Sequence, residues 1–190
     1  MSNRHTLSIT LADEAGELSR VVGLFSARGY SIETIAVGKT LEPEWSRATI
    51  VTSGDERTIE QIVKQCARLA RVREVKLITS EPHIEREMAL IDVSAKAGAE
   101  RQEVMNLVTI FRAKVVDISH EKMILEMSGT REKVDTFIEM LDPLVVNEVT
   151  RSGSVAISRL SPFVSELKAT AAGSGVSVAR TEVRAHDSQN

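Results

Sequence analysis

The chain has 190 residues, and its 42% hydrophobic content is enough for one large or two small domains. Its 24 Lys and Arg residues are nearly balanced by 27 Asp and Glu residues, without long blocks of one sign. Because phosphate backbones demand a concentrated basic surface, we expect no nucleic-acid partner.

The amino-terminal sequence MSNRHTLSIT lacks the apolar run of an export signal. No later stretch approaches the ~20 uninterrupted apolar residues that span a bilayer. The single cysteine, Cys66, cannot form an internal disulfide, which fits a reducing compartment. We therefore expect a cytoplasmic protein without a membrane partner.

The first 80 residues predict the element order βαββαβ. Apolar alternation predicts a strand over residues 5–11, and the turn Asp13-Glu14-Ala15-Gly16 leads into a helix that Gly29 ends. Further strands are predicted over residues 31–37 and 46–52. A second helix beginning at Asp55 then leads to a closing strand over residues 72–78.

The same order begins again after Ser80-Glu81-Pro82. Strands are predicted over residues 84–95, 114–118, 123–127 and 145–150, with helices over residues 101–112 and along the apolar stripe Val134, Phe137, Ile138 and Leu141. Residues 48–75 and 122–149 share one plan of strand, Ser-Gly turn, amphipathic helix and Val-rich strand. A repeat of this length indicates a duplicated small domain rather than a solenoid.

These patterns predict an α+β protein of two tandem ferredoxin-like modules, each an antiparallel sheet with helices on one face. We assign residues 1–80 to the first domain, residues 84–159 to the second, and residues 160–190 to a flexible tail because they are small and polar. The bare sheet face and the sheet edges are expected to be covered by pairing of modules or chains.

A search for catalytic residues is mostly negative. The 4 histidines lie in different regions without metal-ligand spacing, and Cys66 falls on the inward stripe of its helix. Gly16, Gly23 and Gly29 are too widely spaced for a dinucleotide or Walker loop. We expect no catalytic residue and no metal site. Trp45, in a loop beside Pro43, is either a cover for that loop or a contact for a partner.

One local feature indicates binding. The turn from Asp13 to Gly16 precedes a helix, whose first N–H groups and positive potential suit a small anion such as an amino-acid carboxylate. Gly16 has no side chain, so a ligand could approach the backbone there. A plain capped turn remains the alternative interpretation of these residues.

Longer segments resemble a known family. Residues 11–37, LADEAGELSRVVGLFSARGYSIETIAV, with the later SRATIVTSGDE, HIEREMALI and VTRSGSVAISR, are similar to the small regulatory subunit of acetohydroxyacid (acetolactate) synthase. The resemblance runs from about Thr6 to Arg159. It implies that the first module is an ACT domain, an amino-acid-sensing fold of the same βαββαβ order.

The resemblance implies a subunit without an active site of its own. It would activate a catalytic subunit that depends on thiamine diphosphate and carries Mg²⁺ and FAD, and it would confer feedback inhibition by valine in branched-chain amino-acid synthesis. A homodimer is implied because the effector of this family lies between the ACT modules of two chains.

The resemblance also implies the effector-binding residues. Asp13, Gly16, Glu17 and Leu18 belong to the strand-helix turn of one chain, and Ser31 and Ile32 to the start of the second strand of the other. The common family forms are Asn-Glu-Ser-Gly and Tyr-Asn-Ile, whereas this chain has Asp13 and Ser31 at the variable positions. An ionised Asp13 accepts hydrogen bonds but donates none, so valine sensitivity is expected to be weak or altered.

Two other classes of protein are alternatives for this fold. The first is a free-standing double-ACT sensor, similar to the glycine-cleavage repressor type, that acts on a transcriptional partner. The second is a small ferredoxin-like enzyme of the acylphosphatase kind, which requires an arginine and an amide around a phosphate loop. Nothing in this sequence resembles that loop.

Overall fold

The computed structural model describes residues 4–141 and 146–160. Contacts divide the chain into one unit of residues 1–158 and another of residues 159–190. The predicted flexible tail lies outside the described residues except at its start. Among the residues described, no helix is both long and apolar enough to cross a membrane.

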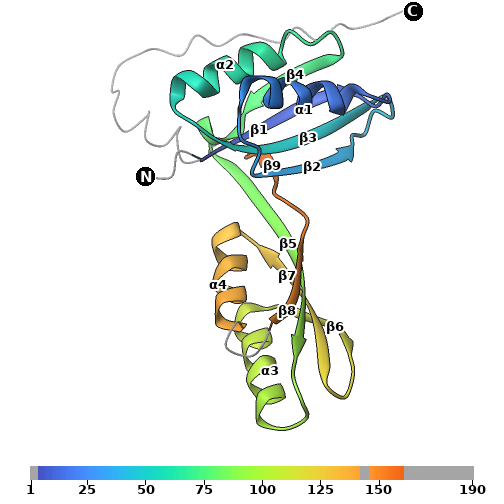
Figure 1. The fold of residues 1–190 in the computed structure, drawn as a ribbon, viewed down its shortest axis with the longest axis vertical. Coiled ribbons are helices and arrows are strands. Elements are labelled where there is room, and N and C mark those ends of the chain that lie inside the picture. The colour runs from blue at the N-terminus through green and yellow to red at the C-terminus, as the bar shows by residue number, and fades with distance from the viewer. Residues whose placement is uncertain (1–3, 142–145, 161–190) are drawn as a thin grey trace, which may run out of the picture. The chain divides into compact units, whose positions relative to one another are not determined.

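The first module is a four-stranded antiparallel sheet with two helices on one face (Figure 1). The strand order is β2-β3-β1-β4, so β2 and β4 are the edge strands. Its elements are β1 (Arg4–Ala12), α1 (Glu17–Arg28), β2 (Thr34–Lys39), β3 (Trp45–Ser53), α2 (Glu56–Cys66) and β4 (Val72–Leu77).

The core of this module follows from the predicted periodicities. Leu7, Ile9 and Leu11 alternate along β1 and are buried beneath the helices. Gly29 ends α1 in the left-handed conformation, with φ 69°. Asp55 caps α2 by accepting a 2.7 Å hydrogen bond from the Thr58 N–H. The buried side chains of the helices recur every three or four positions, at Val21 and Phe25 on α1 and at Ile59, Ile62 and Cys66 on α2, so one face of each helix packs on the sheet.

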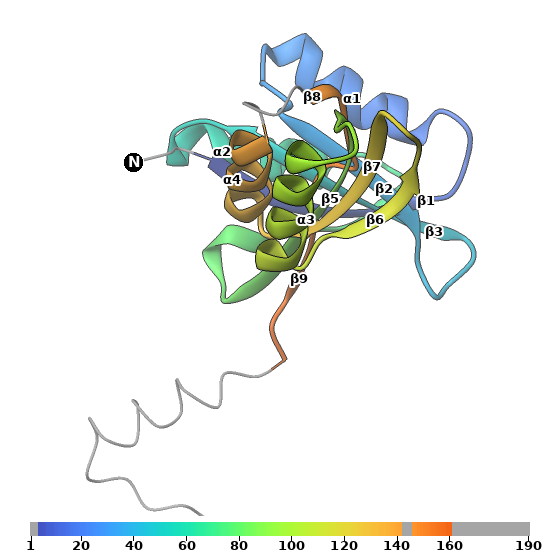
Figure 2. The ribbon, with the colours of Figure 1, turned by 90° about the horizontal axis from the view of Figure 1, so that it is seen from below.

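The second module repeats the plan with strand order β6-β7-β5-β8. Figure 2 shows α3 and α4 lying side by side. A short 3-10 turn, η1 (Ile78–Ser80), precedes it, and its elements are β5 (His83–Ser94), α3 (Ala99–Phe111), β6 (Lys114–Ile118), β7 (Lys122–Gly129), α4 (Arg131–Leu141) and β8 (Val146–Arg151). The predicted fold class of two tandem βαββαβ modules is confirmed.

A short strand, β9 (Val155–Ser158), was not predicted. It pairs antiparallel with the first residues of β5, from His83↔Ser158 to Arg86↔Val155. In Figure 1 it lies against the first sheet on the side away from the helices, and it contacts β1.

The bare face of the first sheet differs from the apolar surface that we expected. Small hydroxyl side chains and one valine line it and are buried, namely Thr6, Ser8, Thr10, Thr49 and Val51. Part of its covering comes from within the chain, because Thr6 donates a 3.0 Å hydrogen bond to Glu85, which pairs with Ala156 of β9. This face of the first module is therefore covered in part by residues of the second module, as expected, but its lining is richer in hydroxyl groups than expected.

Candidate functional site

The turn between β1 and α1 holds the predicted anion-binding groups. Gly16 stands at the N-cap of α1 with φ 92°, in the left-handed region that glycine adopts without strain. No side chain caps this helix. The first turn therefore relies on backbone groups alone.

The N–H groups at this helix start are only partly used. Glu17 N–H donates to Glu14 O at 3.3 Å, and Arg20 N–H donates to Gly16 O at 3.0 Å. Within the described part of the chain, the N–H groups of Leu18 and Ser19 have no acceptor. Free donors at the positive end of a helix are what a small carboxylate needs.

The side chains of two predicted effector residues in the first turn of α1 make contacts within the first module. The Glu17 side chain is buried at 8% exposure and pairs with the Arg20 guanidinium at 3.2 Å. Leu18 packs against the core of the first module. A ligand at this turn would therefore meet backbone groups rather than these two side chains, and of the two residues only Leu18 keeps an N–H without an acceptor in the described part of the chain.

Asp13 anchors the turn to the β2–β3 hairpin. Its carboxylate accepts a 2.9 Å hydrogen bond from Ser46 Oγ and pairs with Lys39 Nζ at 3.0 Å. The hydrogen bonds from Lys39 and Ser46 lower the pKa of Asp13. Asp13 therefore stays ionised, and Lys39 offsets its charge beside the helix start.

Lys39 and Ser46 were missed at the sequence level. Strand pairing brings them together, because Lys39↔Ser46 is the last pair of the β2–β3 ladder. The register of a hairpin depends on its loop, and the 5 residues of this loop did not specify it. The sequence indicated their contact with Asp13 only by placing a lysine and a serine on the two sides of the β2–β3 loop.

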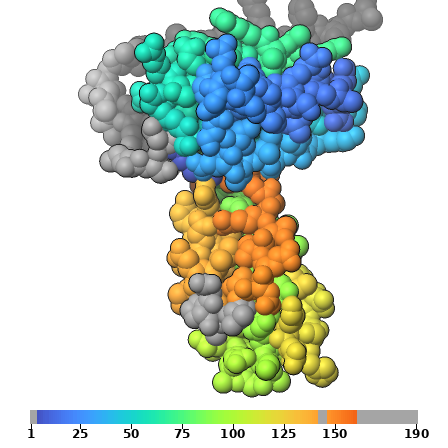
Figure 3. Space-filling model, in the orientation of Figure 1, coloured from blue at the N-terminus to red at the C-terminus, as the bar shows by residue number. Residues whose placement is uncertain are grey.

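Ser31 and Ile32 lie at the other end of α1, after Gly29. A helix of 12 residues is about 18 Å long at ~1.5 Å per residue, so one chain does not bring them to the Asp13–Gly16 turn. Both ends of α1 lie at the surface, in darker and lighter blue in Figure 3. A site made of both segments therefore requires a second protomer.

The immediate surroundings of these two residues are local. Thr52 Oγ1 donates a 2.6 Å hydrogen bond to Ser31 O, and Ile32 packs against its own core. The edge strand β2 follows at Thr34. Its outer side has no partner strand among residues 4–141 and 146–160, so another chain could pair there.

Among the described residues, neither of the two catalytic features considered from the sequence, a metal site and a reactive thiol, is present. The described residues contain no group of His, Cys, Asp and Glu side chains placed to hold a metal ion. Cys66 is buried, and burial raises the pKa of its thiol to about 11, which suppresses the reactive thiolate. The prediction that Cys66 packs on the inward face of its helix is confirmed.

Comparisons with known families match both modules. Residues 7–74 match the family described as the AHAS small subunit-like ACT domain, and residues 86–160 match the small subunit of acetolactate synthase. This chain belongs to the acetolactate synthase small-subunit family. The predicted ACT character of the first module is thereby confirmed.

Individual relatives agree with this family assignment. The acetolactate synthase small subunit of Haemophilus influenzae is 43% identical over 82% of this chain and 96% of the relative. That of Aquifex aeolicus is 40% identical over 82% and 81%. The crystal structure of the small subunit from Thermotoga maritima superposes with a TM-score of 0.78 at 40% identity, covering 84% of this chain and 99% of that one.

Proposed function

We propose that this chain is the regulatory subunit of acetolactate synthase. It binds the catalytic subunit, raises its activity and makes it sensitive to a branched-chain amino acid, with valine as the expected effector. The observation that carries the proposal is the family match of both modules in order along one chain. The alternative, a free-standing double-ACT sensor that acts on a transcriptional partner, is less well supported because the second module matches the small-subunit family.

The chemistry belongs to the partner in this proposal. The catalytic subunit binds thiamine diphosphate, Mg²⁺ and FAD and condenses pyruvate with a second 2-keto acid. This chain contributes no residue to that reaction. Its contribution is a surface that docks on the catalytic subunit and a site that responds to the end product.

The effector site is proposed to form between two protomers of a homodimer. The N–H groups from Gly16 to Leu18 of one protomer receive the effector carboxylate. The positive potential of the helix start and the Leu18 N–H, which has no acceptor among the described residues, support this, and Glu17 N–H makes only a long 3.3 Å hydrogen bond to Glu14 O. Ser31 of the second protomer accepts from the ammonium group, and Ile32 contributes part of the apolar wall. Asp13 keeps further acceptor capacity beside its contacts to Lys39 and Ser46.

Selectivity among aliphatic effectors is expected to be modest. One methylene in an apolar pocket is worth only about 1–3 kcal/mol, so leucine and isoleucine should also bind. The effector changes activity only insofar as it binds one arrangement of the assembly better than another. A ligand between two ACT modules can exert that preference, because it contacts both protomers.

Reconstitution tests the proposal directly. The chain is added to the purified catalytic subunit with its cofactors, and turnover is measured with and without valine, leucine and isoleucine. Higher turnover on addition, lowered again by one of these amino acids, is the expected result. Unchanged turnover would reject the regulatory role, while activation without any amino-acid response would reject only the sensor function.

A further inference from the structure

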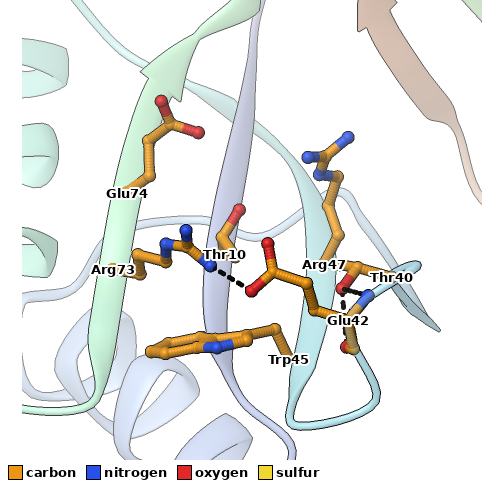
Figure 4. A pocket seen from close by; sticks show the side chains of 7 residues that line it. All are labelled: Thr10, Thr40, Glu42, Trp45, Arg47, Arg73 and Glu74. Carbon is orange, nitrogen blue, oxygen red and sulfur yellow. Dashed lines mark hydrogen bonds and ion pairs between the residues drawn. The ribbon is translucent and has the colours of Figure 1, made fainter. Parts of the chain in front are cut away.

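A pocket on the first module is lined by none of the proposed effector contacts, although its β2–β3 loop also holds the effector turn through the Asp13 N–H, which donates to Glu44 O at 2.8 Å. The pocket has a volume of about 360 Å³, and its lining comes from β1, β3, β4 and the β2–β3 loop. Figure 4 shows the Trp45 ring below Arg73, with the Glu42 carboxylate directed at Arg73 and Arg47 on the opposite side. Leu41, at 105% exposure, precedes Glu42 in the same loop. We call Leu41, Glu42, Trp45, Arg47 and Arg73 the loop surface.

The loop surface is held in place before any partner arrives. Thr40 N–H donates to Trp45 O at 2.9 Å, and Trp45 N–H donates to Glu42 O at 3.0 Å. Thr40 Oγ1 donates to Glu42 O at 2.9 Å and accepts from Glu42 N–H at 3.2 Å. A loop ordered in this way loses little conformational freedom on binding.

The acidic side chains of the loop surface and its pocket are paired, but one arginine is not. Arg73 lies 5.3 Å from the Trp45 ring centroid and pairs with Glu42 at 2.6 Å, and Glu74 pairs with Lys76 at 2.9 Å. Both carboxylates of the pocket are thus neutralised. In the part of the chain that the structure describes, Arg47 has no ion-pair partner. The Arg47 guanidinium, across the pocket from the Trp45 ring in Figure 4, is thus left to pair with a group from outside.

We propose that the loop surface is where this chain docks on the catalytic subunit, and that it receives an acidic side chain flanked by an apolar one. The inference rests on the proposed function. The carboxylate pairs with Arg47, and the apolar neighbour covers Leu41 and the free edge of Trp45. Tryptophan and arginine are the residue types that dominate binding energy at protein interfaces.

A second copy of this chain fits the loop surface less well. A two-fold contact centred there would place Arg47 near Arg47 of the other copy, and like charges oppose such pairing. The pocket also suits a small molecule poorly, because Arg73 already lies over the Trp45 ring and the pocket is mostly polar. These alternatives remain as outcomes of the test.

The test compares variants in activation of the purified catalytic subunit. Arg47→Glu and Trp45→Ala are expected to raise the chain concentration for half-maximal activation by about tenfold or more, with Leu41→Ala causing a smaller rise. Arg68→Glu makes the same charge change in the turn after α2, and Ile110→Ala removes an exposed apolar side chain of α3, so both should behave as wild type. Thermal unfolding confirms that each variant is folded.

The outcomes separate the two proposals. If the wild-type chain activates but Arg47→Glu and Trp45→Ala match it, the docking site is wrong while the regulatory role stands. If the wild-type chain does not activate, the proposed function fails first. A change in the sedimentation of the free chain, with activation unchanged, would assign the loop surface to a second copy and overturn this inference.

Discussion

The two modules begin their first helices in different ways. In the first module, Gly16 starts α1 without a side-chain cap, and the turn is tied down from outside by Asp13. In the second, Gly98 starts α3, also without a side-chain cap. There the Arg101 guanidinium fills the turn and donates to the carbonyls of Ala95, Ser119 and His120 at 2.7 to 2.9 Å.

The group that anchors the turn differs between the proposed effector turn and its counterpart in the second module. Arg101 brings a positive charge into its turn but spends its donors on backbone acceptors, so it ties β5 to the β6–β7 hairpin. Around Asp13, the contacts use carboxylate oxygens and leave the helix N–H groups of Leu18 and Ser19 free. Among the described residues both helix starts keep N–H groups without an acceptor, those of Leu18 and Ser19 in α1 and those of Glu100 and Arg101 in α3. The two turns therefore differ in their anchor, which is a carboxylate in the first and a guanidinium in the second.

The strongest test of this difference is to place the same charge at both turns. Gly16→Asp should raise the effector concentration for half inhibition by about tenfold or more, because a carboxylate at the helix start repels the effector carboxylate. Gly98→Asp, at a backbone with φ 127°, should lower stability and leave inhibition unchanged. Synthase activity of the reconstituted pair, titrated with valine, measures both.

A control separates charge from backbone strain at Gly16. Asparagine tolerates positive φ better than most residues and carries no charge, so Gly16→Asn should keep much of the inhibition. A Cβ at this position meets no atom within 4 Å, so steric overlap is not expected. Equal loss in both variants would show that side-chain bulk, not charge, matters, and unchanged inhibition in Gly16→Asp would reject the site.

The second prediction concerns the turn before α3. Arg101→Ala removes charge-assisted hydrogen bonds to the partly buried carbonyl of Ala95 and to the exposed carbonyls of Ser119 and His120, and should cost about 2–3 kcal/mol of unfolding free energy. Lys133→Ala, an exposed cation on α4, should cost much less. Chemical denaturation followed by circular dichroism gives both values.

The buried thiol of the first module shows where the loss occurs. Cys66 reacts with a thiol reagent only when its surroundings open, because it is buried and its pKa is raised to about 11. If Arg101 stabilises only its own module, Arg101→Ala leaves the labelling rate of Cys66 unchanged. Faster labelling would show that the two modules open as one unit, and it would contradict the expectation that Arg101 stabilises only the second module.

Periodicity predicted most of the fold because the buried faces are regular. The stripe Ile59, Ile62 and Cys66 on α2 is one example. The prediction from periodicity failed where tertiary contacts determine the start of an element. Strand β2 begins at Thr34 rather than near Ser31, because Gly29 ends α1 and the next residues pack inward, with Tyr30 edge-to-face against Phe25 at 6.0 Å.

Strand β9 and the contacts of Asp13 could not be predicted either, because both depend on residues that are distant in the sequence. The apolar alternation of β9 spans only 4 residues, and its partner lies more than 60 positions earlier. The role of Asp13 was only half predicted. Its type indicated an acceptor, but the contacts to Lys39 and Ser46 follow from hairpin register, which local sequence does not set.

The third prediction weakens the anchor of the proposed effector turn without removing it. Asp13→Asn keeps an oxygen for Ser46 but loses the ion pair with Lys39, whose charge is then free beside the helix start. The common family form has asparagine here, so we expect tighter inhibition by roughly threefold, through lower repulsion of the effector carboxylate. Calorimetric titration of the free chain measures the affinity, and weaker binding would assign the ammonium contact to Asp13.

The smallest expected effect is at the contact between β1 and the strand of the second module. Burial would raise the pKa of Glu85, but hydrogen bonds from Arg4, Ser154 and Thr6 outweigh it and lower the pKa below its usual value. A depressed pKa means that the ionised form stabilises the fold above the pKa of the unfolded chain. This stabilisation is lost as the pH falls through the folded value.

Glu85→Gln should therefore lower the unfolding free energy by about 1 kcal/mol near neutral pH, with the difference from wild type shrinking below about pH 4. Glu60→Gln is the matched control, because Glu60 pairs with Lys64 on the exposed face of α2 and has a lowered pKa without burial. Denaturation series from pH 3 to 7 would check it. If the difference in unfolding free energy between Glu85→Gln and the wild type stayed constant down to pH 3, the prediction would be wrong. Protonating Glu85 in the wild type would then cost no stability, so the variant would have lost a packing contact rather than the interactions of a charge.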